Sequence, residues 1–480
     1  METRTAALPR QGMVTRLLGL QHGGAPWRRV LTLALPVVGE NLLQTALGIV
    51  DTLLVARLGA AQLAGVGTAL QPIFFLFSIL SAIAVGAAIL ISQAVGAQDQ
   101  QRTALLAKQS LVGCVALAAP VSLVGVALAE PSLRMFGVTD AVAHYGTQYV
   151  QITLATSLVL IVGFVAGSLL RGAGDTRSPM LVSLLANVIN AVAAYGLIFG
   201  NLGLPALGVA GSAWAAVLGR IVAAALLVGL LARGRGALTI AGRWGWRPDF
   251  RVWREVLSLG LPAATEQILI TVGFTGLTLV VAHLGTASLA AQRLAINVML
   301  LSLLPGFGCA VAASTLVGQS VGAHNVDEGV VAAGIATRLA LVWMTVLGLL
   351  FAVFATPLMR AFTADAIVVT LGASCLVAIA AAQPFWAIGN VLAGALRGAG
   401  NTTFPMVVNV LSIWGSVALA LVGVTWAGGG LVWAWVTFSL VTPLSAGAII
   451  WRFRRWAADA DRGLASVPAN PEAPVLGAMG

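Results

Sequence analysis

The feature that most constrains this chain is a long apolar segment that contains acidic residues and occurs twice. The stretch Leu35–Asp51 reads LPVVGENLLQTALGIVD, and 226 residues later the chain reads LPAATEQILITVGFTGL. Pro36 corresponds to Pro262, and Glu40 corresponds to Glu266. An ionisable side chain inside a membrane span costs several kcal/mol, and such residues usually serve a function. The two glutamates are therefore the first candidates for a functional site.

The composition identifies a membrane protein. Hydrophobic residues make up 59% of the chain and charged residues 9%, whereas soluble domains contain about 25% charged residues. About 20 apolar residues cross a bilayer as a helix. The sequence predicts an all-α membrane protein with twelve transmembrane helices, at roughly 30–54, 63–92, 104–129, 143–169, 178–200, 205–232, 255–282, 288–318, 328–356, 365–394, 404–426 and 430–453.

The placement of basic residues predicts how the chain is oriented. Most of them fall in the two tails and in the even-numbered loops: Arg28, Arg29, Arg102, Lys108, Arg171, Arg177, the run at 233–254, Arg397 and Arg452 to Arg455. By the positive-inside rule, both termini are expected to be cytoplasmic in a bacterial plasma membrane. The expected regions are a cytoplasmic tail at 1–29, an N-lobe at 30–232, a linker on the membrane surface at 233–254, a C-lobe at 255–456 and a disordered tail at 457–480.

The repeat extends well beyond the glutamate segment. The sequence QAVGA at 93–97 corresponds to QSVGA at 319–323, and LRGAGD at 170–175 corresponds to LRGAGN at 396–401. Six spans in each copy predict parallel repeats, which gives two pseudo-symmetric six-helix lobes. The LRGAG segments are interpreted as tight turns in cytoplasmic loops, because no GxxxxGK[ST] phosphate-binding loop occurs in the chain.

Helical periodicity places several polar residues on common faces. Glu40, Gln44 and Asp51 form a stripe about 16 Å long, because four and eleven residues both return to the same side of a helix. The candidate site residues are Glu40, Asp51, Asn190 and Glu266 for ion coupling, and Asn41, Gln44, Asn187, Gln267 and Thr271 for a substrate cavity. The alternative is that these groups only join neighbouring helices. Arg293 is expected either to pair with Glu266 or to extend toward the membrane surface.

The chain resembles the multidrug and toxic compound extrusion (MATE) transporters, bacterial DinF-like or NorM-like type, over about residues 30–455. The resemblance rests on Pro36 followed by Val50-Asp51-Thr52 and Leu58-Gly59, on the Q-x-x-G-A segments, and on LRGAGDT at 170–176. It implies two six-helix lobes around a central cleft. It also implies export of organic cations or amphipathic drugs in exchange for H⁺ or Na⁺.

The coupling residues of the family match only in part. DinF-like members have an aspartate at the position of Asp51 and an Asn-x-x-x-Asp motif in span five, and here Asn190 is followed by Ala194. NorM-like members have acidic residues where this chain has Ile270 and Trp386. The resemblance therefore implies a possible Na⁺ site at Asp51 and Asn190 and leaves the coupling ion open.

Three other functions fit the sequence less well than a drug antiporter does. A flippase for lipid-linked precursors would require clustered arginines for a pyrophosphate, and the predicted spans contain acids and almost no arginine. A membrane scaffold would not require duplicated glutamates. An enzyme is disfavoured because the four histidines lack metal-ligand spacing. We expect a monomer without cofactors that acts on small molecules and does not bind nucleic acid.

Overall fold

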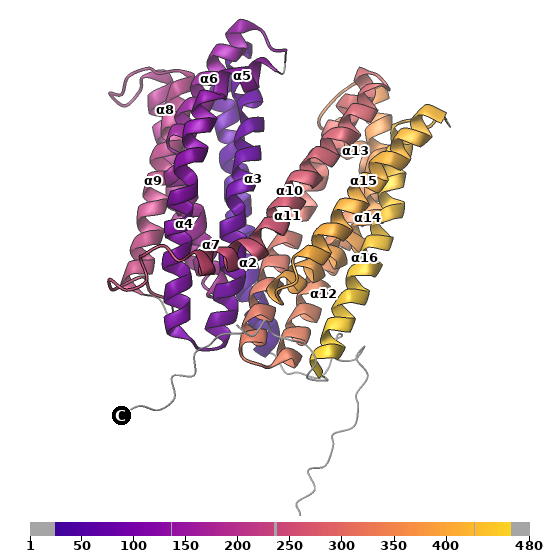
Figure 1. Ribbon diagram of the computed structural model, residues 1–480. Helices are drawn as coiled ribbons and strands as arrows, with labels where there is room; N and C mark the ends of the chain where they lie inside the picture. Colours follow the sequence, from indigo (N-terminus) through magenta and orange to yellow (C-terminus); the bar gives the residue numbers. More distant parts are fainter. Residues whose placement is uncertain (1–24, 136, 235–237, 427, 462–480) are drawn as a thin grey trace, which may run out of the picture.

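The structure, a computed structural model, describes residues 25–461 apart from 136, 235–237 and 427 (Figure 1). Most of both predicted tails lies outside the described residues. The helices are α2 (Ala25–Ala56), α3 (Ala60–Gly96), α4 (Gln100–Ala127), α5 (Ala129–Arg134), α6 (Asp140–Ala155), α7 (Ser157–Gly172), α8 (Arg177–Phe199), α9 (Val209–Arg233), α10 (Phe250–Ala282), α11 (Thr286–Gly322), α12 (Val326–Val353), α13 (Ala355–Arg360), α14 (Ala366–Gly398), α15 (Thr403–Trp426) and α16 (Leu431–Asp461).

The helices confirm the predicted fold class. In the described part of the chain, eleven helices are long and apolar enough to cross a membrane. The pair α6 and α7 gives a twelfth span, bent by 56° at a short break. Its counterpart in the second half, α14, is one continuous helix.

The repeat seen in the sequence reappears in the helix boundaries. Helix α3 covers residues 60–96 and α11 covers 286–322, while α4 covers 100–127 and α12 covers 326–353, so each pair is 226 residues apart. The same offset relates the short helices α5 and α13. Equivalent sequence segments therefore form equivalent helices, as expected when the same periodicity and turn residues recur.

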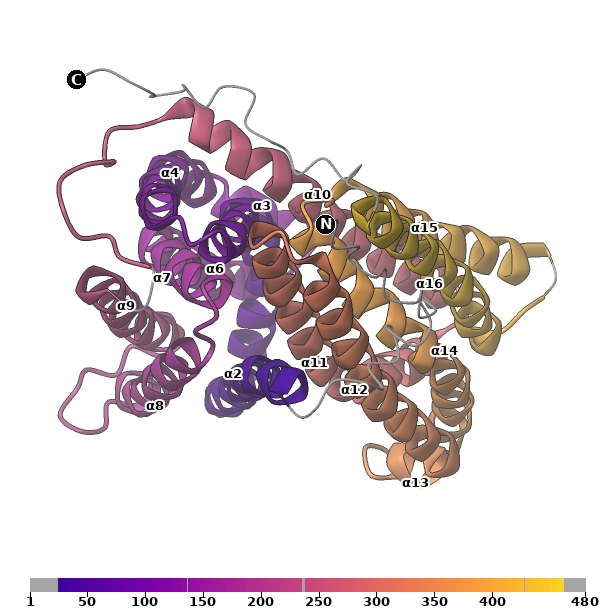
Figure 2. The same cartoon turned by 90° about the horizontal axis from the view of Figure 1, so that it is seen from below.

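The helices form two bundles, α2–α9 and α10–α16 (Figure 1). The bundles meet at the end where α2 begins and α16 ends, and they separate toward the end that holds α5 and α13 (Figures 1 and 2). Helix α2 packs against α11 of the other bundle, and α10 packs in the corresponding way against α3. The first helix of each repeat thus lies between the bundles.

The Q-x-x-G-A segments form one of the close backbone contacts between the bundles. A Cβ atom on Gly96 would lie 1.9 Å from the backbone oxygen of Gln319, and a Cβ on Gly322 would lie 1.9 Å from that of Gln93. Any larger residue would push α3 and α11 apart at this crossing. The Gln93 side chain also donates to the backbone oxygen of Gly398 at 3.0 Å.

Two ion pairs connect the bundles beside this crossing. Arg29 of α2 pairs with Glu328 of α12, and Arg102 of α4 pairs with Glu255 of α10 at 2.5 Å. Positions 29 and 255 are equivalent by the repeat, and so are positions 102 and 328. The two ion pairs are therefore related by the pseudo-symmetry, but their charges are exchanged.

The connection between α9 and α10 is fixed to the end of α4. Lys108 donates to the backbone oxygens of Ala241 at 2.9 Å and Trp244 at 2.7 Å, and Gln109 donates to that of Arg247 at 2.6 Å. The assignment of Lys108 to a basic loop was wrong, because this residue lies inside α4 and is 2% exposed. Its ammonium group instead satisfies the carbonyls of the linker.

Candidate functional site

Glu40 forms a buried ion pair in the N-terminal bundle. It lies one turn after Pro36 in α2 and is 8% exposed. The Nη1 atom of Arg171, in the last turn of α7, lies 3.2 Å and 3.1 Å from the two carboxylate oxygens. The hydroxyl of Ser183, on α8, donates to Oε1 at 3.2 Å. Three helices that are distant in sequence therefore meet at one carboxylate.

Glu266 forms the corresponding ion pair in the C-terminal bundle. It is 4% exposed on α10, and its Oε1 atom accepts from Arg397 and from the amide of Asn409, each at 2.6 Å. Among the described residues, the Oε2 atom of Glu266 has no hydrogen-bond partner. The C-terminal glutamate thus has one carboxylate oxygen free to accept a further bond.

The two ion pairs are copies of one arrangement. Arg171 and Arg397 are equivalent in the repeat, as are Ser183 and Asn409. A charge in the membrane interior needs a partner with good geometry, and in both bundles an arginine at the end of a helix supplies it. The interpretation of the LRGAG segments as simple turns was incomplete, because their arginines belong to the helices and their side chains reach the glutamates.

The first of the two alternatives for Arg293, pairing with Glu266, is not what the described residues show. Arg293 on α11 does not appear among the ion pairs of the described residues, and Arg397 takes that place. The signal that could have identified the correct arginine is the repeat itself. An arginine and a glutamate separated by 131 residues recur together in both halves.

A second polar cluster surrounds Asp51 in the N-terminal bundle. Asp51 lies eleven residues after Glu40, about 16 Å further along α2. Its carboxylate interacts with the side chain of Asn190 on α8 and with the charge of Arg220 on α9. Tyr149, on α6, is 7% exposed and belongs to the same electrostatic network. Asn190 is thus the neighbour of Asp51, as the polar faces of the two spans suggested.

The Asp51 cluster contains polar atoms that lack partners. Within the described residues, Oδ1 of Asp51, Oδ1 of Asn190, Nδ2 of Asn187 and Nη1 of Arg220 are buried and form no hydrogen bond. Buried polar atoms are nearly always satisfied, so such a concentration is typical of a functional site. The sequence analysis did not single out Arg220 or Tyr149, although an arginine inside a span is itself a functional signal.

The remaining predicted residues take less central positions. Gln44, Gln267 and Thr271 are exposed, and Asn41 is partly buried. The hydroxyl of Thr271 donates to the backbone oxygen of Gln267 on its own helix. The structure therefore gathers the predicted ionisable groups into polar sites, whereas these neutral side chains line the surfaces of α2 and α10 beside the glutamates.

The acidic and polar clusters differ from a typical metal site. No group of three or more histidine, cysteine, aspartate or glutamate side chains lies close enough to hold a metal ion within the described part of the chain. The oxygens that could contribute to a Na⁺ site are Oδ1 of Asp51 and Oδ1 of Asn190. A hard cation requires several oxygen ligands, and the positive charge of Arg220 already acts on the same carboxylate.

The fold and the buried ion pairs define a membrane transport protein built from two parallel repeats. Comparison with known families identifies it further: the MatE family model matches residues 36–196 and 262–440. The chain therefore belongs to the MatE family, whose members are multidrug efflux transporters and not enzymes. The two matched segments begin at Pro36 and Pro262, the equivalent prolines of the repeat.

Similar sequences cover nearly the whole chain. The probable multidrug resistance protein NorM of Thermotoga maritima is 32% identical over 414 residues, which are 85% of this chain and 88% of the relative. The probable multidrug resistance protein NorM of Rhizobium meliloti is 31% identical over 447 residues, which are 89% of this chain and 93% of the relative.

Solved structures share the fold at lower identity. A MATE protein in the bent conformation has a TM-score of 0.86 and 20% identity, covering 95% of this chain and 100% of the other. A multidrug resistance MATE family transporter in an outward-facing conformation has a TM-score of 0.84 and 22% identity, covering 94% and 99%. A transporter of Pyrococcus furiosus, described as having a binding pocket of reverse polarity, has a TM-score of 0.84 and 20% identity, covering 94% and 99%.

Proposed function

We propose that the protein is a secondary active antiporter of the bacterial plasma membrane. It exports organic cations or amphipathic drugs in exchange for protons by alternating access, and both termini face the cytoplasm. The observation that carries this proposal is the pair of buried carboxylates, Glu40 and Glu266, each held by an arginine of its own bundle. A carboxylate that is paired internally can accept a cationic substrate in place of its arginine, so the carboxylate itself is compensated both with and without the substrate.

The two bundles support a division of work between substrate and ion. Glu266 has an acceptor oxygen without a partner, and a cationic substrate near it would compete with Arg397 for the carboxylate. Asp51 faces Arg220 and Asn190, and its protonation would remove the attraction that holds this cluster together. Drug binding thus acts on the Glu266–Arg397 ion pair, and proton binding acts on the attraction between Asp51 and Arg220. Each ligand therefore binds the inward-open and the outward-open conformation with a different affinity.

A proton fits the Asp51 cluster better than a sodium ion. A proton needs one acceptor atom, and the unpartnered Oδ1 of Asp51 supplies it. Sodium would require further oxygens beyond those of Asp51 and Asn190. The membrane potential adds about 2.3 kcal/mol per charge per 100 mV to any inward movement of a cation.

A flippase for an anionic, lipid-linked substrate is the second candidate. One observation favours it: Arg171, Arg220, Arg338 and Arg397 all lie inside helices, so the expectation of spans almost without arginine was wrong. Arg171 and Arg397 form ion pairs with glutamates, and Arg220 faces Asp51. Three of the four charges therefore act on a carboxylate, and Arg338 by itself is not the arginine cluster that a pyrophosphate requires. A cation is thus the better substrate.

The proposal is tested by transport of a fluorescent organic cation, ethidium, in proteoliposomes. We expect an imposed pH gradient to drive ethidium across the membrane and an imposed Na⁺ gradient at constant pH to have no effect. Transport driven only by sodium would assign the coupling ion to Na⁺. Absence of transport under both gradients, with scrambling of a fluorescent lipid-linked pyrophosphate instead, would replace the antiporter with the flippase.

A further inference from the structure

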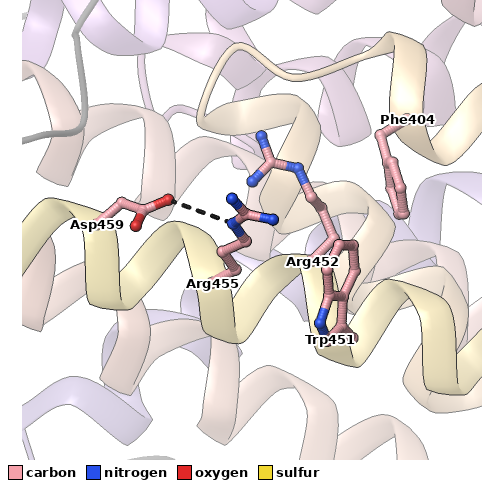
Figure 3. A pocket seen from close by; sticks show the side chains of 5 residues that line it. All are labelled: Phe404, Trp451, Arg452, Arg455 and Asp459. Atoms are coloured by element: carbon pink, nitrogen blue, oxygen red, sulfur yellow. Dashed lines mark ion pairs between the residues drawn. The ribbon is translucent and has the colours of Figure 1, made fainter.

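A cationic pocket separate from the glutamate clusters lies at the end of the C-terminal bundle where the bundles meet. Here the first turn of α15 and the last turns of α16 enclose a pocket of about 370 Å³. The lining residues are Phe404, Trp451, Arg452, Arg455 and Asp459 (Figure 3). None of these residues belongs to the Glu266 or Asp51 clusters.

The side chains that line the pocket carry a net positive charge. Arg452 and Arg455 extend from α16 toward the same space (Figure 3). The Nε atom of Arg455 lies 4.0 Å from a carboxylate oxygen of Asp459, and Arg452 forms no ion pair among the described residues. Two guanidinium groups around one carboxylate leave a positive charge, and guanidinium groups bind phosphate oxygens through paired hydrogen bonds.

Aromatic rings form the other walls of the pocket. Trp451 is 55% exposed, and its ring centroid lies 6.3 Å from that of Phe404. The guanidinium of Arg455 lies 5.7 Å from the Trp451 ring centroid. Tryptophan is enriched at the level of lipid headgroups, where one part of the ring is apolar and the other is hydrated.

The N-terminal bundle lacks this combination at the equivalent place. Ser178 is the counterpart of Phe404 by the repeat, and the last eight residues of α9 read LLVGLLAR, with a single arginine at position 233. The corresponding end of α16 contains Arg452, Arg454 and Arg455. Because the same fold forms without the arginines and the aromatic pair in one half, the fold itself does not require the pocket.

We propose that this pocket binds the headgroup of an anionic phospholipid from the leaflet on the side of the chain termini. Arg452 and Arg455 hold the phosphate, while Trp451 and Phe404 contact the glycerol and the first carbons of the acyl chains. The bound lipid joins α15 to α16 in the C-terminal bundle only, so it acts on one side of the pseudo-symmetric structure.

The test is native mass spectrometry of the full-length transporter in detergent, titrated with phosphatidylglycerol or with phosphatidylcholine. We expect one phosphatidylglycerol to bind with higher affinity than phosphatidylcholine. Arg452→Gln/Arg455→Gln should weaken phosphatidylglycerol binding about thirtyfold, because each basic residue near an anionic lipid contributes about fivefold. The matched comparison is between single variants: Arg452→Gln and Arg455→Gln should each weaken binding about fivefold. Arg454→Gln, which removes one charge from an exposed position of the same helix, should change affinity less than twofold.

Further variants and competitors make the result decisive. Arg452→Lys retains the positive charge but loses the planar guanidinium. It should bind phosphatidylglycerol more tightly than Arg452→Gln and less tightly than the wild-type protein. Millimolar inorganic phosphate should not displace the lipid, because it lacks the apolar part that contacts the rings. Equal weakening by Arg454→Gln would show attraction to surface charge in general and would overturn the proposal, as would equal binding of the two lipids or displacement by phosphate alone.

Discussion

The two bundles contain the same glutamate–arginine pair but differ eleven residues further along their first helices. In the N-terminal bundle this position is Asp51, which faces Asn190. In the C-terminal bundle the equivalent positions are Leu277 and Ser416, both fully buried. The hydroxyl of Ser416 donates to the backbone oxygen of Ser412 on its own helix, so neither of these two counterparts has an unpartnered polar side-chain atom.

This difference separates what belongs to the repeat from what was added to one half. The buried ion pair occurs twice, with the same helices contributing the same positions, so it is part of the shared architecture. The Asp51 cluster occurs once and contains several unpartnered polar atoms. An energetically costly feature present in only one half is the better candidate for ion coupling, whereas the duplicated pair is suited to a substrate that contacts both bundles.

The largest effect is expected from the feature that occurs once. Asp51→Asn should reduce pH-driven ethidium transport to the background of empty liposomes, because the amide cannot exchange a proton, while equilibrium ethidium binding to the purified protein is retained. Ser416→Ala, at the counterpart of Asn190, should transport at close to the wild-type rate. Substantial pH-driven transport by Asp51→Asn would remove the coupling site from this cluster.

The duplicated pairs should give the next largest effect. Glu266→Gln and Glu40→Gln should impair transport about equally, and each should lower the free energy of unfolding by about 3–5 kcal/mol because an arginine is left buried without its partner. Thermal unfolding in detergent measures the second quantity. The double variant Glu266→Gln/Arg397→Gln should recover much of the stability but none of the transport.

That double variant distinguishes a functional pair from a structural one. If it regains transport together with stability, the C-terminal pair only joins helices α10 and α14. If Glu266→Gln alone transports at the wild-type rate under both gradients, coupling and substrate binding belong to the N-terminal bundle.

A smaller effect is expected from the one partner that differs between the pairs. Glu40 accepts from the hydroxyl of Ser183, and Glu266 accepts from the amide of Asn409. Asn409→Ser should cost about 1–3 kcal/mol of stability, the usual value for a hydrogen bond to a charged group, and should shift the apparent affinity for ethidium. Stability is measured by thermal unfolding and affinity by fluorescence titration, and Ser183→Ala is the matched change in the other bundle.

The smallest effect is expected from the exposed ion pairs between the bundles. Arg29–Glu328 and Arg102–Glu255 are each about half exposed, and such pairs contribute about 0.2–1 kcal/mol. Glu328→Gln should therefore shift the conformational equilibrium by at most about fivefold toward the state that is open on the side where the bundles meet. Distances between spin labels on α4 and α12 measure this shift, and the exchange Arg29→Glu/Glu328→Arg should restore the original balance. No recovery in the exchanged variant would mean that the pair does not hold this side closed.

The sequence determined the elements and their duplication. Apolar runs long enough for a bilayer specify helices because the backbone must satisfy its own hydrogen bonds in lipid, and the 226-residue repeat specified which helices correspond. Glu40, Asp51 and Glu266 were identified from the sequence alone, because a charged side chain inside an apolar span is energetically costly. These properties are local, so a single chain reveals them.

The partners of those charges were decided only by the tertiary structure. Arg171 and Arg397 were placed in loops by sequence, yet their helices continue far enough for the side chains to reach glutamates 131 residues earlier in the chain. Lys108 was placed in a loop as well, and it holds the linker from inside α4. Helical periodicity shows which residues share a face of one helix, but it contains no information about which other helix that face will meet. Pairing between helices depends on the packing of the whole bundle. That packing brings each arginine next to its glutamate.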